Sequence, residues 1–242
     1  RVLSGYSDVI AMRHPESGSV AEFASASRVP VLNGGDGANE HPTQALLDLY
    51  TIRCELASKH REIDGLRIAM IGDLRHGRTV HSLSKLLCLF DNITVVLISP
   101  KALSMPGSIV EMLRQKGHKV VISDQLEANI CDVDIVYSTR IQEERFHSQE
   151  EADIYRGKFR LNQSVYTKFC QPNTVIMHPL PRDSRDSARE LDDDLKDKTE
   201  TAMIAASLNR EGPKWHFTPL GEFVEGGLGA VAGRYGLVIA QQ

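Results

Sequence analysis

Short apolar runs alternate with longer amphipathic runs along most of this 242-residue chain. The clearest apolar runs are residues 66–71, 93–98, 119–122, 134–137 and 174–177. Strands that are apolar throughout are buried on both faces, which is typical of parallel sheets covered by helices. The alternation therefore predicts an α/β protein built on doubly wound parallel sheets.

The first sixty residues carry a further set of such elements. Residues 8–12 and 29–33 are predicted strands, and residues 20–26 are a predicted helix with Ser19 as its N-cap. The glycines after the second of these strands predict a turn. A long amphipathic helix is predicted over residues 42–60, because its apolar residues fall on one side. The proline that opens it is tolerated, since it loses no hydrogen bond in a first helical turn.

This order of elements predicts two doubly wound parallel-sheet domains, the first of them incomplete. The first domain takes residues 1–42, and residues 43–60 form a linking helix. The second domain runs over residues 61–189. Residues 190–242 are a C-terminal segment with glycine-rich runs that continue neither pattern.

Composition narrows the class of partner. The formal net charge is -4, so the chain has no basic surplus with which to neutralise a nucleic acid or an acidic membrane. No apolar stretch approaches the roughly 20 residues of a membrane helix, and no signal peptide is visible. The four cysteines are widely spaced and form no CxxC pair, which favours a reducing cytoplasm over a disulfide or zinc framework. We therefore expect a cytoplasmic protein with no nucleic-acid partner, no membrane and no metal.

Polar residues follow five of the predicted strands. Ligands of open parallel sheets bind beyond the carboxyl ends of the strands, so these residues are the ones to inspect. They are Met12-Arg-His-Pro15, Glu40-His-Pro-Thr-Gln44, Gly72-Asp-Leu-Arg-His-Gly-Arg-Thr79, Ser138-Thr-Arg-Ile-Gln142 and His178-Pro-Leu-Pro-Arg182. Every string offers an arginine, a histidine or an amide, which a purely structural sheet would not need.

Each residue taken alone also has an ordinary structural interpretation. Arg13 is equally compatible with a surface charge. His41 fits a local helix cap, and a lone histidine more often has such a structural role than a catalytic one. Arg78 and Arg140 lie in short polar turns, where a guanidinium can present its fork to a carboxylate. The two prolines of residues 178–181 make either a rigid turn or a support for main-chain carbonyls that face a ligand. Together these residues predict capture of small anions and polarisation of a carbonyl by positioning and electrostatics.

The five strings resemble those of the carbamoyltransferase family, and of its aspartate-specific members in particular. The first string extends upstream to about Ser7, the second covers residues 31–44, the third extends to Ser82 and the fourth to Arg145. Their order and spacing hold without interruption to Arg182, over about three-quarters of the chain.

The resemblance implies roles around carbamoyl phosphate. Arg13 and His41 would hydrogen-bond its carbonyl oxygen, where charge grows as an amine attacks. Gln44 would hold the carbamoyl amide, so these three are the predicted catalytic residues. Leu180 and Pro181 would present backbone carbonyls to the reacting nitrogens.

The resemblance also implies an acceptor site for L-aspartate. Arg78 would bind the α-carboxylate and Arg140 the β-carboxylate, with Thr139 and Gln142 beside them. Pro179 favours the aspartate enzymes, since the ornithine enzymes have a cysteine after this histidine. The product would be N-carbamoyl-L-aspartate, with release of phosphate, in the committed step of pyrimidine synthesis. No cofactor is implied.

Two departures from the family pattern leave alternatives open. The family's Ser-Thr-Arg-Thr phosphate string and a later serine–lysine loop are expected upstream of Arg1, so residues 1–42 would be a remnant of the carbamoyl-phosphate-binding domain and residues 61–189 the aspartate-binding domain. Residues 199–242 do not show the family's closing Gln-x-x-Asn-Gly segment. The full-length family forms homotrimers with shared sites, in some cases with regulatory chains. The alternatives are a carbamoyltransferase for another amine acceptor and a non-catalytic assembly subunit of the same fold.

Overall fold

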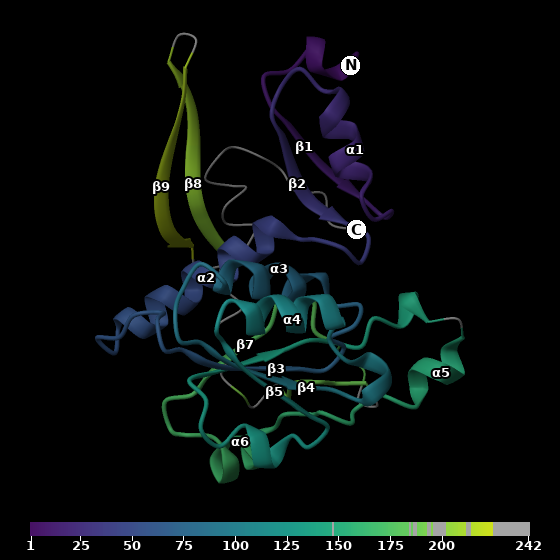
Figure 1. Cartoon of the computed structure of the whole chain (residues 1–242), viewed down its shortest axis with the longest axis vertical. Helices are drawn as coiled ribbons and strands as arrows, with labels where there is room; N and C mark the ends of the chain where they lie inside the picture. Colours follow the sequence, from purple (N-terminus) through teal and green to yellow (C-terminus); the bar gives the residue numbers. More distant parts are fainter. Residues whose placement is uncertain are drawn as a thin grey trace. The chain divides into compact units, whose positions relative to one another are not determined.

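A computed structural model gives the fold (Figure 1). It describes residues 1–146, 148–183, 185, 188–192, 195, 202–211 and 214–224. The chain divides into two compact units, Arg1–Lys196 and Asp197–Gln242.

A five-stranded parallel sheet is the centre of the first unit. Its strands are β3 (Arg67–Ile71), β4 (Thr94–Ile98), β5 (Lys119–Ser123), β6 (Ile135–Ser138) and β7 (Val175–Met177). They lie in the order β5-β4-β3-β6-β7, and every neighbouring pair is parallel. The chain therefore winds outward from β3 in both directions, which confirms the predicted doubly wound sheet.

Helices cover both faces of this sheet, as its apolar strands require. Ile68 and Met70 of β3 belong to a buried cluster with α2 (Pro42–Ala57), α3 (Arg78–Leu87) and α4 (Gly107–Gln115). Ala69 and Ile71 alternate to the other face, where they join a cluster that packs against α6 (Gln163–Phe169). Figure 1 shows α3 and α4 on one side of the strands and α6 on the other. The sequence did not predict α6.

The first region forms a smaller parallel pair, β1 (Ile10–His14) and β2 (Val31–Asp36), with α1 (Ser19–Ala26) beside it. The predicted cap of α1 is wrong. Gly18 is the N-cap, at a φ of 85°, and the Ser19 hydroxyl donates to the Glu16 carbonyl instead. Strand β2 also runs through the predicted glycine turn. The buried carboxylate of Asp36, its last residue, accepts hydrogen bonds from the backbone and side-chain N–H groups of the surrounding loops and so stabilises this path.

Shorter elements complete the described part of the chain. The 3-10 helices are Leu3–Gly5, Lys101–Leu103, Glu127–Asn129 and Glu143–Arg145, and α5 is the short helix Gln149–Asp153. In the second unit, β8 (Ala202–Glu211) and β9 (Lys214–Val224) form an antiparallel pair that the sequence did not predict. The glycine-rich run 226–229 lies outside the described residues.

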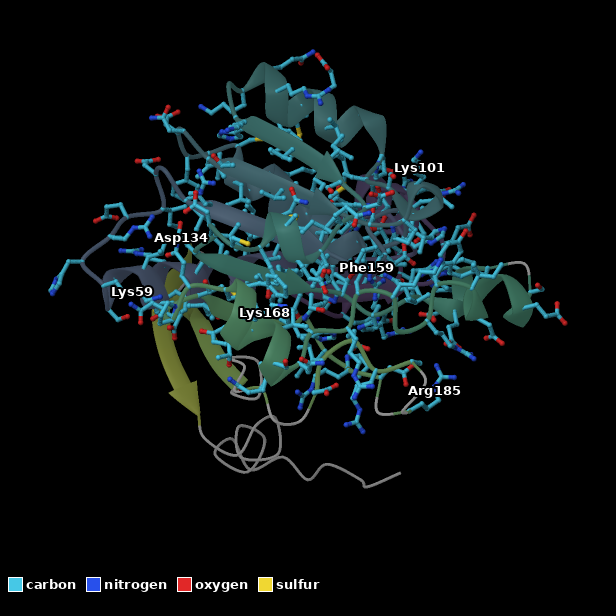
Figure 2. All side chains as sticks on the ribbon, turned by 90° about the horizontal axis from the view of Figure 1, so that it is seen from below. Lys59, Lys101, Asp134, Phe159, Lys168 and Arg185 are labelled. Carbon is cyan, nitrogen blue, oxygen red and sulfur yellow. The ribbon has the colours of Figure 1, made fainter. Side chains whose placement is uncertain are left out.

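The parallel strands give the sheet a defined polarity, which is visible in Figure 2. Asp134, just before β6, lies with Lys59 at one end of the sheet, where its carboxylate pairs with Arg61. Lys101, in the segment after β4, lies at the opposite end. The carboxyl ends of the strands thus share one edge. No helix in the described part of the chain is long and apolar enough to cross a membrane.

Candidate active site

Residues at the carboxyl ends of β1, β2, β3, β6 and β7 line one pocket with a volume of about 500 Å³. The three residues predicted as catalytic all line it: Arg13, His41 and Gln44. The six predicted as substrate-binding also line it: Arg78, Thr139, Arg140, Gln142, Leu180 and Pro181. The structure therefore brings together nine side chains that are spread over 169 positions of sequence, from 13 to 181. A polar concave site of this size suits a small ligand.

His41 is the N-cap of α2, and its capping hydrogen bond fixes the orientation of its ring. Its Nδ1 accepts the backbone N–H of Gln44 at the long distance of 3.4 Å, so the ring proton belongs on Nε2. Burial, together with the positive charges of Arg78 and Arg13, lowers the pKa of His41 to about 4. At neutral pH His41 is therefore an uncharged hydrogen-bond donor.

Arg78 opens α3 and reaches across to the loop after β2. Its Nη1 donates to the Gly37 carbonyl at 3.1 Å. A Cβ on Gly35 would lie 2.9 Å from the same Nη1, so glycine is what lets the guanidinium lie against this backbone. Burial lowers the pKa of Arg78, and the nearby charges of Arg13 and Arg145 act in the same direction. Arginine remains charged under these conditions, and an anion beside it would relieve the repulsion.

Thr139 reaches the pocket because the end of β3 has no side chain beside it. Gly72, at a φ of 107°, is so close that a Cβ there would lie 2.3 Å from the Thr139 carbonyl oxygen. The Thr139 backbone N–H and its hydroxyl both donate to the Ile71 carbonyl, each at 2.9 Å. Glycine at position 72 thus fixes the direction in which the chain leaves β6.

Arg140 already has a carboxylate partner within the chain. Its Nη1 and Nη2 donate to the two oxygens of Glu144 at 3.0 and 2.6 Å. The contact is a two-point ion pair of the kind that guanidinium groups form with a substrate carboxylate. Because Glu144 is about half exposed and Arg140 about a third exposed, the pair can open toward the pocket at little cost.

Gln142 is held between two loops. Its side-chain amide donates to the His76 carbonyl at 2.9 Å, and its backbone N–H lies 3.3 Å from an oxygen of Asp73. The fully buried Asp73 also accepts the His76 backbone N–H at 3.0 Å. These bonds join the loop after β3, which leads to Arg78, to the loop after β6, which contains Arg140. The positions of the two arginines are therefore coupled.

The turn after β7 contributes residues 178–181 to the pocket wall. The bond from Leu180 to Pro181 is cis, and Leu180 has a φ of 55°. The buried ring of His178 accepts the Leu180 backbone N–H at Nδ1, at 2.9 Å. Prolines on both sides of Leu180 limit the backbone further. The turn is therefore rigid and also lines the pocket. That its main-chain carbonyls face a ligand stays a prediction.

Seven lining residues were not among the predicted site residues: His14, Pro15, Thr79, Glu144, Arg145, His178 and Pro179. All of them lie inside the sequence strings that carried the prediction. Arg145, which ends the fourth string and was given no role at the site, lies in the pocket wall. The signal for it was its position six residues after Thr139 in the same string.

Electrostatics define what the pocket can do. Four of its described lining residues are arginines, and Glu144 is the only carboxylate among them. Such a surface attracts a ligand that carries several negative groups. The Nε2–H of His41 adds a neutral donor that can stabilise negative charge on a carbonyl oxygen.

Two family models match the chain. The aspartate/ornithine carbamoyltransferase carbamoyl-phosphate-binding domain matches residues 1–54, and the aspartate/ornithine-binding domain of the same family matches residues 64–211. The two matches leave residues 55–63 between them, which are the end of α2 and the turn that follows it.

Known proteins resemble the chain along most of its length. The aspartate carbamoyltransferase catalytic subunit of Cellvibrio japonicus is 71% identical over 86% of the chain and 62% of its own length. The corresponding subunit of Saccharophagus degradans is 69% identical over the same shares. The chain thus spans about three-fifths of the length of these relatives.

Solved structures show the same fold. The aspartate transcarbamoylase of Trypanosoma cruzi in complex with N-(phosphonacetyl)-L-aspartic acid superposes with a TM-score of 0.70 at 38% identity, over 80% of the chain and 59% of its own. The catalytic subunit of the M. jannaschii enzyme gives a TM-score of 0.66 at 42% identity, over 80% and 59%. Other structures of the Trypanosoma cruzi enzyme hold carbamoyl phosphate, alone or together with aspartate.

Proposed function

The chain belongs to the aspartate/ornithine carbamoyltransferase family, and we propose that it carries the acceptor site and part of the donor site of an aspartate carbamoyltransferase. The observation that supports this most is that four arginines and the neutral ring of His41 line the same pocket. Two carboxylates and a phosphate need several positive groups, and a carbonyl that becomes an oxyanion needs donors.

The donor half of the reaction takes place around Arg13 and His41. The amine of L-aspartate attacks the carbonyl carbon of carbamoyl phosphate, and the new C–N bond moves an electron pair onto the carbonyl oxygen. Arg13 and the Nε2–H of His41 stabilise that charge. The carbonyl then re-forms, the C–O bond to phosphate breaks, and the amine gives up its proton to the departing phosphate. Phosphate and N-carbamoyl-L-aspartate leave.

Other pocket groups orient the carbamoyl nitrogen. Its N–H groups need acceptors, and the Gln44 carbonyl oxygen and the main-chain carbonyls of Leu180 and Pro181 supply them. The rigid turn around Leu180 supports this role, because a fixed carbonyl loses little freedom when it binds a ligand.

The acceptor half lies around Arg78 and Arg140. Arg78 binds the α-carboxylate of aspartate and Arg140 its β-carboxylate, while Thr139 and Gln142 add hydrogen bonds. The Glu144 carboxylate that pairs with Arg140 occupies the position that a substrate carboxylate would take. Binding of aspartate therefore shares or displaces the Glu144 contact.

The same proposal covers the parts of the parent protein. Residues 1–42 belong to the carbamoyl-phosphate-binding domain, residues 43–60 link the domains, and residues 61–189 form the aspartate-binding domain. The parent is a cytoplasmic homotrimer that acts in pyrimidine synthesis. The four cysteines, free in the described part of the chain, are compatible with a reducing compartment.

Calorimetric titration tests the proposed function. The protein to use is a complemented chain, in which the N-terminal segment of the Cellvibrio japonicus subunit is fused ahead of residue 1. We expect N-(phosphonacetyl)-L-aspartate to bind it, and Arg78→Ala to weaken that binding by about 100-fold, as the loss of a charge-assisted carboxylate contact implies. Arg114→Ala, which removes an exposed arginine of α4, is the matched control. A folded complemented chain that binds neither this compound nor succinate would contradict the proposal.

A further inference from the structure

A buried carboxylate lies behind the pocket and has no part in the proposed mechanism. Asp48 is only 4% exposed, in the middle of the linking helix α2. Its carboxylate accepts two hydrogen bonds, from the Tyr137 hydroxyl at 2.6 Å and from the Gln44 side-chain amide at 2.9 Å. Burial of an ionisable group in this way costs free energy, so its partners indicate what it does.

One of the two partners faces the ligand. Gln44 lies one helical turn before Asp48 on the same side of α2, and it also lines the pocket. Its amide has two chemically different ends, an NH2 that donates and a carbonyl oxygen that accepts. Whichever end turns inward to Asp48, the other end is the one that the pocket presents to a ligand.

The chemistry of Asp48 decides between these orientations. Burial raises the pKa of Asp48 to about 7. Above that pH its carboxylate is ionised, accepts hydrogen bonds and donates none, so only the NH2 end of Gln44 can turn toward it, which is the contact observed at 2.9 Å. The second oxygen is already taken by Tyr137, a fully buried residue of β6. Burial raises the pKa of Tyr137, so this hydroxyl keeps its proton and stays a donor. Asp48 is thus surrounded by two donors, and the Gln44 oxygen is left for the pocket.

We propose, on the basis of the proposed function, that Asp48 is a positioning residue that holds Gln44 as a hydrogen-bond acceptor and thereby selects a carbamoyl group over other acyl groups. The NH2 of carbamoyl phosphate donates to the oxygen that Gln44 presents. Acetyl phosphate has the same shape and charge but carries a methyl group there, which gives no hydrogen bond. With Gln44 reversed, two NH2 groups would face each other and the selection would be lost.

The position of Tyr137 gives Asp48 a second connection. Tyr137 is followed by Ser138 and then by Thr139 and Arg140, which line the acceptor side of the pocket. The hydrogen bond between Asp48 and Tyr137 therefore links the helix that contains Gln44 to β6, the strand that leads to Arg140. One buried carboxylate sets the position of groups on both sides of the reacting carbon.

The test measures the dissociation constants of carbamoyl phosphate and acetyl phosphate for the complemented chain, at a pH well above the pKa of Asp48 so that its carboxylate is ionised. We expect Asp48→Asn to weaken carbamoyl phosphate at least about tenfold relative to acetyl phosphate, since one good hydrogen bond is at stake. Asparagine can donate as well as accept, so it no longer dictates how Gln44 turns. Thr51→Val is the matched control, because it also removes a buried hydrogen-bonding group from α2 but does not contact Gln44.

A double-mutant cycle separates positioning from a merely structural role. If Asp48 acts through Gln44, Asp48→Asn should leave the ratio of the two affinities unchanged when Gln44 is already methionine. Should Asp48→Asn fail to fold, Asp48→Leu replaces the buried charge with an apolar group of similar size and answers the same question. A parallel loss of both ligands, or an unchanged ratio with Gln44 in place, would overturn the inference. If the unsubstituted protein binds neither acyl phosphate, the proposed function fails first.

Discussion

His41 illustrates how single residues in this pocket take their properties from their neighbours. Its position before Pro42 left both a helix cap and a catalytic role open from the sequence. In the structure His41 is the helix cap, and this contact turns Nδ1 toward the helix, so that the predicted catalytic role would fall to Nε2–H. No sequence pattern could give its charge state, which depends on burial and on two arginines from distant parts of the chain.

The charge state of His41 can be measured directly. We expect its ring to titrate with a pKa of about 4 in NMR spectra of the histidine side chains. Arg78→Ala should raise that pKa toward the ordinary value of 6.5, because it removes a nearby positive charge. Arg114→Ala, far from the pocket, should leave it unchanged. A ring of His41 that titrates near 6.5 in the unsubstituted chain would remove the basis for a neutral donor.

Asp48 makes a pH-dependent contribution to stability. Burial raises its pKa from 3.8 to about 7, so the folded state holds a proton that the unfolded state has lost between these two values. The free energy of unfolding should therefore fall as pH rises from about 4 to about 7, by roughly 1.4 kcal/mol per pH unit from this group. Denaturant unfolding of the chain and of Asp48→Asn across this range isolates the effect. The asparagine variant should gain on the unsubstituted chain as pH rises, and a constant difference would contradict the assignment.

Arg140 is the proposed partner of the second carboxylate and so the main reason to propose a dicarboxylate acceptor. In the complemented chain Arg140→Ala should cost roughly 2–5 kcal/mol of transition-state stabilisation, read from kcat/KM for aspartate. Arg140→Lys should recover only part, because a point charge does not reproduce the two-point contact now made with Glu144. Folding stability should change by at most about 1 kcal/mol, since the pair is partly exposed. Unaltered aspartate kinetics would return Arg140 to an ordinary surface charge.

At the scale of elements, the pattern of apolar runs located the five strands of the main sheet to within a residue or two. This worked because buried parallel strands are apolar throughout, and the rule for their carboxyl ends then identified the site strings. The failures were local. The turn predicted after residue 33 is the end of β2, because Asp36 supplies the loop's hydrogen bonds from its side chain. Amphipathic periodicity over seven residues is too short to identify α6.

The backbone at Gly72, just after β3, determines where Thr139 lies in the pocket. We expect Gly72→Ala to destabilise the fold by about 2 kcal/mol or more, because its φ is positive and the new Cβ would meet the Thr139 carbonyl. Relief of that contact would shift Thr139 and with it Arg140, so dicarboxylate affinity should fall as well. Gly65→Ala is the matched control, since Gly65 also has a positive φ of 77° but nothing lies near its missing Cβ. Equal effects of the two substitutions on dicarboxylate affinity, measured by titration with succinate, would show that crowding at Thr139 does not matter.

At the scale of the whole molecule, five strings separated by long stretches of sequence line a single pocket, and the family match covers both predicted regions of the chain. The strings identified the pocket because residues that bind one ligand must lie at one edge of the sheet. What the sequence could not give was the arrangement of groups behind the pocket, such as Asp48 with Tyr137, which are 89 positions apart. Their contact depends on how α2 packs against β6.

Carbamoyl transfer by the complemented chain tests the central claim most directly. The assay follows radiolabelled carbamoyl phosphate into an acid-stable product, with L-aspartate and L-ornithine as alternative acceptors. Arg78 and Arg140 together favour a dicarboxylate, so the product should be N-carbamoyl-L-aspartate, and ornithine should accept at least about 100-fold more slowly. Rate should also fall in Arg140→Ala and not in Arg114→Ala. A folded complemented chain that carbamoylates ornithine as readily as aspartate, or transfers no carbamoyl group at all, would contradict the account.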